Sequence, residues 1–229
     1  MRLHGTVPGG GVTSENWSGY AVTGSSFTFA KGSWHVPEVD CSKTPNTYSA
    51  FWEGIDGYSD KTVEQTGTAS DCDGTTAQYY AWYEFYPAGS VPISMPIEAG
   101  DVMGASVTYS DGKFTVSIHN HTTGAEFSKT LAVAGAKRTS AEWIAEAPSN
   151  SSGEILPLAD FVRASFGADY ASDPGTNYAT DSAVSDGPII DFGSNYHEIT
   201  MVSSGSVVEA TPTALTADGT SFRVNWKAE

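Results

Sequence analysis

The sequence contains few positively charged residues. It has 11 Lys and Arg residues against 27 Asp and Glu, which gives a formal net charge of -16 at pH 7. An ordinary domain of this length would carry roughly 28 basic residues. Nucleic acids and anionic membranes bind basic surfaces, so we expect neither of them as a partner.

The same shortage favours tolerance of acid. At neutral pH the excess of acidic side chains repels itself. In acid the carboxylates become neutral, and 11 Lys and Arg with 5 His residues leave little positive charge to repel in their place. The composition therefore indicates a protein that is stable in acid, although a generic acidic secreted protein has a similar composition.

Long apolar runs are also missing, and the chain has only two cysteines. No run is long enough to cross a membrane, and the start of the chain lacks the apolar stretch of a signal peptide. We therefore expect a mature secreted protein, with residues 1–13 as a flexible segment and residues 14–229 as a single domain. The two cysteines, Cys41 and Cys72, lie in polar segments, and in an extracellular chain we expect them to form a disulfide.

Long helical periodicity is absent, and short alternating runs are separated by Asp-Gly, Pro-Gly and Ser-Gly turns. Residues 111–135 and 205–226 each have the pattern of two strands joined by a turn. Residues 156–171 are compatible with a helical turn or with strands. The pattern predicts an all-β fold, an antiparallel β-sandwich or jelly roll.

Period-2 alternation separates two faces of the predicted strands. One face carries apolar residues, and the other mixes aromatic residues with carboxylates or amides: Tyr80, Trp82, Glu84 and Tyr86; Trp52, Gly54 and Asp56; Val63 and Gln65; Glu142, Ile144 and Glu146. The mixed faces are either solvated outer surfaces or the lining of a groove. Both interpretations stay open at this point, although large aromatic side chains usually have a ligand or a neighbour to cover them.

Several catalytic motifs are missing. The chain has no G-x-S-x-G, no H-E-x-x-H, no Gly-rich phosphate loop and no pair of Asp-Thr/Ser-Gly turns. His119 and His121 place two imidazoles on one strand face, but no clear third ligand accompanies them. We expect a surface pair there, and neither a metal nor a cofactor.

Motifs that follow one another in a fixed order carry a family resemblance: NWSGYAV (16–22), FWEGIDG (51–57), VEQTG (63–67), AWYEFYP (81–87) and AEWIAEAP (141–148). In this order they resemble the glutamic peptidases, the eqolisin family of pepstatin-insensitive acid endopeptidases. The resemblance spans residues 14–229 and is strongest up to residue 148. It implies a concanavalin A-like jelly roll of two packed antiparallel sheets, with the substrate groove on a concave face.

The resemblance also implies roles for particular residues. The glutamine before Thr-Gly is Gln65 and the glutamate of Ala-Glu-Trp is Glu142, and these two correspond to the catalytic pair. Positions expected to bind substrate are Trp17, Trp52, Asp56 and Glu84. The implied protein is a secreted, monomeric endopeptidase that acts on polypeptides.

Peptide hydrolysis is chemically compatible with this pair. It needs a base for the water, donors for the oxyanion and an acid for the leaving amine. An ionised Glu142 would take the proton of the water and later deliver it to the nitrogen, with no covalent intermediate. Gln65 would orient the water and donate to the oxyanion, and its amide does not titrate in acid. We expect hydrogen bonds or a polar setting to lower the pKa of Glu142, because the base must be ionised.

A second class of protein stays open. A carbohydrate-active jelly roll, either a glycosidase or a lectin-like module, also lines its concave face with aromatic residues and two carboxylates. In that case Glu84 and Glu142 would be the acid and the nucleophile, about 5–5.5 Å apart in a retaining enzyme. Gln65 would then only bind a sugar hydroxyl.

Overall fold

Antiparallel strands make up most of the chain in the computed structural model, which describes residues 3–6, 11–171, 173 and 175–228. The strands are β1 (Leu3–Thr6), β2 (Val12–Ser14), β3 (Trp17–Thr23), β4 (Phe27–His35), β5 (Ala50–Ile55), β6 (Val63–Asp73), β7 (Thr76–Tyr86), β8 (Val91–Ile93), β9 (Val102–Ser110), β10 (Lys113–Asn120), β11 (Ala125–Leu131), β12 (Ser140–Glu146), β13 (Arg163–Phe166), β14 (Tyr178–Asp181), β15 (Ser185–Pro188), β16 (Tyr196–Val202), β17 (Val208–Pro212) and β18 (Phe222–Trp226). A short helix α1 (Ala168–Ala171) and a 3-10 helix η1 (Ile189–Asn195) complete the elements. In the described ranges, no helix has the length and apolar character needed to span a membrane.

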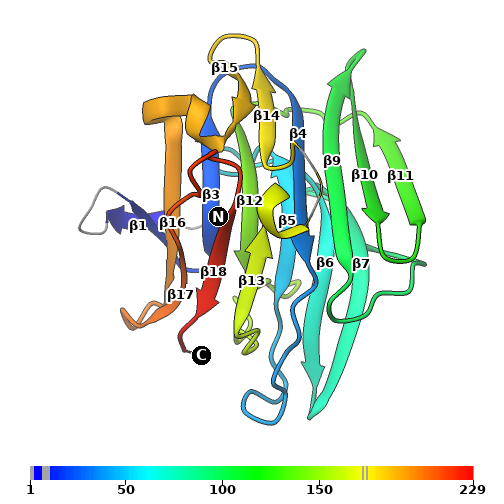
Figure 1. Cartoon of the computed structure of the whole chain (residues 1–229), viewed down its shortest axis with the longest axis vertical. Helices are drawn as coiled ribbons and strands as arrows, with labels where there is room; N and C mark the ends of the chain where they lie inside the picture. Colours follow the sequence, from blue (N-terminus) through cyan, green and yellow to red (C-terminus); the bar gives the residue numbers. More distant parts are fainter. Residues whose placement is uncertain (1–2, 7–10, 172, 174, 229) are drawn as a thin grey trace.

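The first layer contains the strands on which the catalytic pair is predicted. Its strands follow the order β8, β7, β6, β5, β12, β3 and β16, and every neighbouring pair is antiparallel (Figure 1). Strands distant in sequence therefore become neighbours, as β12 lies between β5 and β3. This arrangement places the motifs of residues 16–22, 51–57, 63–67, 81–87 and 141–148 side by side.

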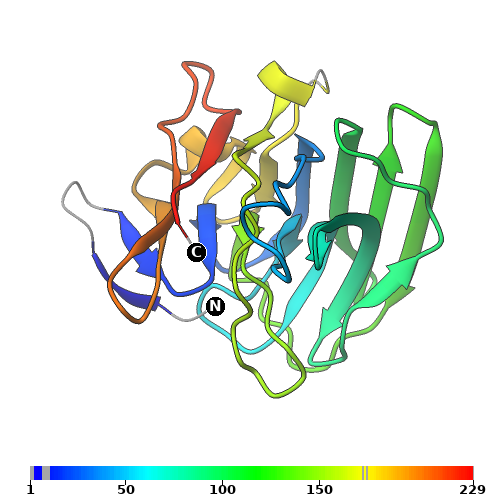
Figure 2. The same cartoon turned by 90° about the horizontal axis from the view of Figure 1, so that it is seen from below.

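The second layer continues from the same ribbon of strands. From β16 the pairing passes through β17, β18, β13, β4, β9 and β10 to β11. Figure 2 shows β9 to β11 in one layer and the β6–β7 hairpin in the other. The core between the layers is formed by large apolar side chains, including Trp34, Phe51, Phe114, Trp143, Phe161 and Phe166. The predicted antiparallel β-sandwich is confirmed.

The strand pairs predicted from the local sequence pattern are present. Residues 111–135 form the hairpin β10–β11, and residues 205–226 form β17 and β18, as expected. Residues 156–171 contain both alternatives, strand β13 followed by helix α1. Within the segment predicted to be flexible, β1 pairs with β2, and β2 runs parallel to β16. Residues 1–2 and 7–10 of that segment lie outside the described residues, and the domain boundary at residue 14 stays a prediction.

The expected disulfide joins Cys41, in the connection between β4 and β5, to Cys72 near the end of β6. The sulfur atoms are 2.05 Å apart and the residues are separated by 31 positions. In the chain-entropy treatment, closing a loop of this length stabilises the fold by about 3–4 kcal/mol. The bond ties β6, the strand that carries Gln65, to the connection between β4 and β5.

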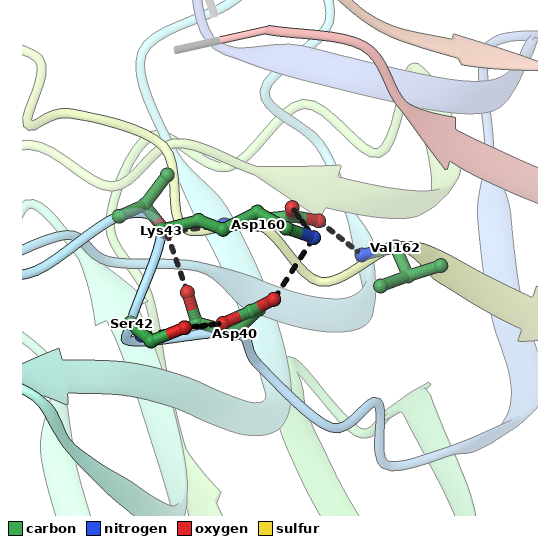
Figure 3. Close-up of polar contacts among 6 residues, drawn as sticks. Asp40, Ser42, Lys43, Asp160 and Val162 are labelled. Carbon is green, nitrogen blue, oxygen red and sulfur yellow. Dashed lines mark hydrogen bonds and ion pairs between the residues drawn. The ribbon is translucent and has the colours of Figure 1, made fainter.

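A network of charged side chains anchors the same connection (Figure 3). Lys43 Nζ lies 2.9 Å from Asp40 Oδ2 and 3.3 Å from Asp160 Oδ2, and the Ser42 hydroxyl donates to Asp40 at 2.6 Å. Asp160 is buried and its other oxygen accepts the Val162 amide at 2.9 Å. Hydrogen bonds from Lys43 and then Ser42 lower the pKa of Asp40 to about 2. Asp40 therefore keeps its charge in moderately acidic solution.

Two carboxyl groups lie unexpectedly on the core side of the first layer. Glu53 and Glu64 are both 0 % exposed, and their carboxyl oxygens have no hydrogen-bond partner among the described residues. Burial raises the pKa of Glu53 well above its ordinary value. Burial, with nearby Asp56 and Asp60, raises the pKa of Glu64 to about 9. Both groups are therefore neutral in acid, which is the form that a core tolerates.

Candidate active site

Gln65 and Glu142 lie in one row across three adjacent strands, with Gly54 between them. Gly54 is the register partner of Gln65 on one side and of Glu142 on the other. Register partners point to the same face of a sheet, so both side chains project from the face opposite the core, with their backbones about 10 Å apart. A Cβ at Gly54 would lie 3.0 Å from both Gln65 Cβ and the Glu64 carbonyl oxygen. Glycine therefore keeps the space between the two side chains open.

The row continues on both sides of this pair. Glu84 on β7 is the register partner of Gln65, and its Oε2 accepts a hydrogen bond from Gln65 Nε2 at 2.5 Å. The side-chain oxygen of Gln65 has no partner among the described residues. On the other side, Ala21 is the partner of Glu142 and His197 is the partner of Ala21. The row thus runs from Glu84 to His197 across the first layer.

Glu142 is fully buried at 0 % exposure. Burial raises the pKa of Glu142 well above its ordinary value, and nearby Asp56 and Asp60 add to this, while the Ser140 hydroxyl lowers it. The expectation of a lowered pKa is therefore wrong. The physical reason is that Glu142 is flanked by Gly54 and Ala21, which bring no side-chain donors, so desolvation dominates.

The predicted tryptophans form the apolar floor beside the row. Trp17 and Trp52 pack edge to face with ring centroids 4.9 Å apart, in a cluster that also contains Trp82 and Ile144. Both rings are almost fully buried, at 2 % and 0 % exposure. The two rings therefore form a packed apolar surface beside the row, and their contact with substrate stays a prediction.

Glu146 is a site residue that the sequence did not single out. Its carboxyl accepts hydrogen bonds from Trp52 Nε1 at 2.7 Å and from Asn16 Nδ2 at 3.0 Å. Burial raises the pKa of Glu146 to about 7. The available signal was its position four residues after Glu142, which alternation places on the same face.

Asp56 contacts the segment that precedes β12, and its role in substrate binding stays a prediction. It is 0 % exposed, and its carboxylate accepts the backbone amides of Lys137, Arg138 and Thr139 at 2.8, 2.7 and 2.7 Å. These three residues lead directly into β12, the strand of Glu142. The structure thus gives Asp56 the geometry of a support for that strand, since its oxygens are turned to the protein's own backbone.

Tyr58 and His197 form a wall at the end of the row. Their rings stack with centroids 5.0 Å apart and planes 17° apart, and His197 Nε2 lies 3.2 Å from the Thr23 hydroxyl. Burial, and then the charge of Glu142, raise the pKa of Tyr58. Nothing in the sequence distinguished this pair, because the contact joins a loop to a strand far along the chain.

His119 and His121 are remote from this row. They lie on the outer face of the second layer with ring centroids 4.3 Å apart, beside a hollow of about 710 Å³, and His121 Nε2 is 3.5 Å from Asp173. In the part of the chain that the structure describes, no group of three potential ligands is arranged to hold a metal ion.

Comparison with known proteins gives one consistent result. The model of the Peptidase A4 family matches residues 15–214. Aspergillopepsin-2 of Aspergillus niger is 28% identical over 211 residues, which cover 81% of this chain and 74% of that protein. The scytalido-glutamic peptidase, solved with a transition-state analogue inhibitor, aligns over 93% of this chain and 99% of its own, with 26% identity and a TM-score of 0.76.

A second solved structure, the aspergilloglutamic peptidase from Aspergillus niger, aligns over 79% of this chain and 99% of its own, with 25% identity and a TM-score of 0.60. The family match covers most of the chain and includes all the strands that form the row. This chain therefore belongs to the Peptidase A4 family.

Proposed function

We propose that the protein is a glutamic endopeptidase that hydrolyses polypeptides in acid, with Gln65 and Glu142 as the catalytic pair. Membership of the Peptidase A4 family supports the activity. The observation that supports the pair is the row in which Gln65 and Glu142 face the same space above Gly54. A relative bound to a transition-state analogue and another bound to a tripeptide support polypeptide substrates.

The buried position of Glu142 leads to a particular form of acid–base catalysis. In acid its carboxyl is neutral, with a proton on one oxygen. As water attacks the carbonyl carbon of the substrate, this proton passes to the carbonyl oxygen. The other oxygen of Glu142 takes a proton from the water. The product of this step is an uncharged gem-diol, and Glu142 is again neutral.

Breakdown of the diol uses the same carboxyl. Glu142 gives its proton to the amide nitrogen, and the carbon–nitrogen bond breaks. One hydroxyl of the diol returns a proton to the other carboxyl oxygen, which leaves an acid, an amine and neutral Glu142. No covalent bond to the enzyme forms, and the carboxyl carries no net charge in either resting form.

Gln65 contributes orientation and a donor. Its side-chain oxygen, which has no partner among the described residues, accepts a hydrogen bond from the attacking water. One N–H of its amide is bonded to Glu84, and the second N–H donates to the oxygen that forms from the carbonyl. A single donor of this kind contributes about 3–4 kcal/mol to transition-state stabilisation in other hydrolases.

The carbohydrate-active alternative has less support. Glu84 and Glu142 are separated by Gln65 and Gly54 in the row, so their backbones are three strand spacings, about 14 Å, apart. Glu84 is also bonded to Gln65 and turned toward it. A retaining glycosidase needs its two carboxyl groups about 5–5.5 Å apart on either side of one bond.

We also propose that the protein is secreted and acts as a monomer. The disulfide and the acid-compatible charge balance support an extracellular setting. Sedimentation at pH 4 tests the oligomeric state, and a dimer would contradict the proposal.

Digestion of a denatured protein at acidic pH, with β-glucan digested in parallel, tests the function. We expect peptide cleavage and no sugar release. Gln65→Ala and Glu142→Gln should abolish cleavage while the far-ultraviolet circular dichroism stays that of the parent. Cleavage by a folded Glu142→Gln protein would contradict the assigned pair.

A further inference from the structure

Tyr58 and His197 form a preformed wall at the Glu142 end of the row. His197 lies two strands from Glu142, with only the methyl group of Ala21 between them in the row. Tyr58 stacks on His197 and packs against the apolar cluster beside the row. An extended chain that lies across the row from Glu142 therefore meets the imidazole of His197.

Hydrogen bonds hold this wall in place. Asp60 accepts the amides of Gly57 and Thr62 at 3.2 and 3.1 Å and the Thr139 hydroxyl at 2.9 Å, which fixes the loop of Tyr58. His197 is in turn held by Thr23 at 3.2 Å. The wall does not depend on substrate for its shape.

The ring of His197 has few carboxylates near it, which is unusual in so acidic a protein. No carboxylate of the described residues lies within ion-pair distance of its ring, and burial lowers the pKa of His197. The neighbouring Glu198 is bonded to the Tyr20 hydroxyl at 3.2 Å on the other face. Among the described residues, the titratable groups near the ring include Tyr58, which stacks on it, and Glu142, which lies across Ala21.

The carboxyl groups of Glu142 and Glu146 do not neutralise a positive charge on His197 in acid. Burial raises the pKa of Glu142 well above its ordinary value and raises that of Glu146 to about 7, so these two groups are neutral there. An imidazole is protonated in acid. In acid, this face of the sheet therefore presents one partly desolvated imidazolium beside two neutral carboxyl groups, and a substrate carboxylate or amide oxygen would be its natural acceptor.

We propose that His197, held against Tyr58, is a specificity-determining residue that selects an acidic side chain of the substrate about three residues from the cleaved bond. The spacing follows from geometry, since two strand spacings are about 10 Å and an extended peptide advances about 3.3–3.6 Å per residue. The inference rests on the proposed peptidase function. It predicts discrimination against Lys and Arg at the same substrate position.

This inference can be tested with matched peptides. Each pair of peptides carries Glu or Gln at one position within four residues of a cleaved bond. For the parent protein, we expect the ratio of kcat/KM for Glu over Gln to reach about tenfold at one position near pH 5, the size of a partly solvated charge-assisted hydrogen bond. At pH 3 the substrate carboxyl is mostly protonated, so the ratio should fall. In His197→Gln the ratio should be close to one at both pH values.

The control is His119→Gln, which removes an imidazole on the far face and should keep the parent's ratio. Tyr58→Phe preserves the stacked ring and should keep it too, whereas Tyr58→Ala should reduce it. A His197→Gln protein that still prefers Glu, or a parent with no preference at any position, overturns the inference while peptide cleavage continues. Absence of cleavage of every peptide by the parent would instead contradict the proposed function.

Discussion

Gln65 donates its side-chain N–H to Glu84 across the β6–β7 hairpin, at 2.5 Å between Nε2 and Oε2. This contact decides which end of the amide faces the rest of the row, because a Glu84 oxygen accepts the bond and the amide oxygen is left on the other side. Glu84 is half-buried, and burial raises its pKa, although its bond to Gln65 opposes that change. We therefore propose that Glu84 positions Gln65, whereas its predicted contact with substrate stays untested.

Glu84→Gln tests this relationship. A second amide can present either oxygen or nitrogen to Gln65, so the orientation of Gln65 is no longer determined. We expect kcat to fall about tenfold, less than the loss of an oxyanion donor itself, with little change in KM. Steady-state kinetics of this variant and of Glu126→Gln, a change at an exposed position of β11, provide the measurement. Equal kcat values for the two variants would count against the positioning role.

The neutral form of Glu142 has a consequence for the pH dependence of activity. Because burial raises the pKa of Glu142, the protonated and active form is abundant in acid and is lost as pH rises through that pKa. We expect kcat/KM to fall with rising pH along a single-proton limb, whereas an ionised base with an ordinary pKa would make activity rise above about pH 4. Initial rates should be measured while tryptophan fluorescence shows that the protein is folded. Activity that rises with pH in that range would restore the ionised-base mechanism.

The buried Glu53 and Glu64 predict that the protein is less stable at higher pH. In the unfolded chain a glutamate loses its proton near pH 4.3, whereas in the folded protein the pKa of Glu64 is about 9 and that of Glu53 is well above its ordinary value. Unfolding therefore releases protons above pH 4.3, and the free energy of unfolding decreases by about 1.4 kcal/mol per pH unit for each such group. Below pH 4.3 both states hold the proton and the effect vanishes.

Urea unfolding between pH 4 and 6.5 measures this decrease. Glu64→Gln removes one titrating group, so its free energy of unfolding should depend less steeply on pH by about 1.4 kcal/mol per unit. Glu126→Gln, at an exposed position, is the control and should keep the parent's slope. If Glu64→Gln also keeps the parent's slope, the carboxyl of Glu64 is not protonated in the folded core.

The disulfide predicts a separate loss of stability. Replacing both Cys41 and Cys72 with Ser opens a loop whose ends are 31 residues apart, and we expect the free energy of unfolding to drop by about 3–4 kcal/mol. The active row is built from other residues, so kcat at low temperature should be close to that of the parent. A drop of less than 1 kcal/mol, measured by urea unfolding at pH 4, would show that loop closure contributes little in this chain.

Several features could be predicted because they depend on local geometry. Alternation along residues 51–56, 80–86 and 141–146 assigned the correct face to Trp52, Glu84 and Glu142, since successive side chains of a strand point to opposite faces wherever the strand lies. The order of the motifs predicted the family, and the family match agrees. The hairpins of residues 111–135 and 205–226 followed from turn residues between alternating runs.

Other features depend on which strands become neighbours. The pairing of Gly54 with both Gln65 and Glu142 brings together residues from β6, β5 and β12, and alternation within each strand carries no information about it. Asp56 meets the amide of Thr139 across 83 positions of sequence.

The sequence by itself determined the strands, their faces, the acidic balance and the identities of the two residues proposed to act. The tertiary structure decided the burial and the neighbours of these residues. It buried Glu142 and so raised the pKa that we expected to be lowered, it placed Glu53 and Glu64 in the core, and it aligned His197 with the row. The physical reason is that desolvation depends on everything that covers a group, and that cover comes from residues distant in sequence.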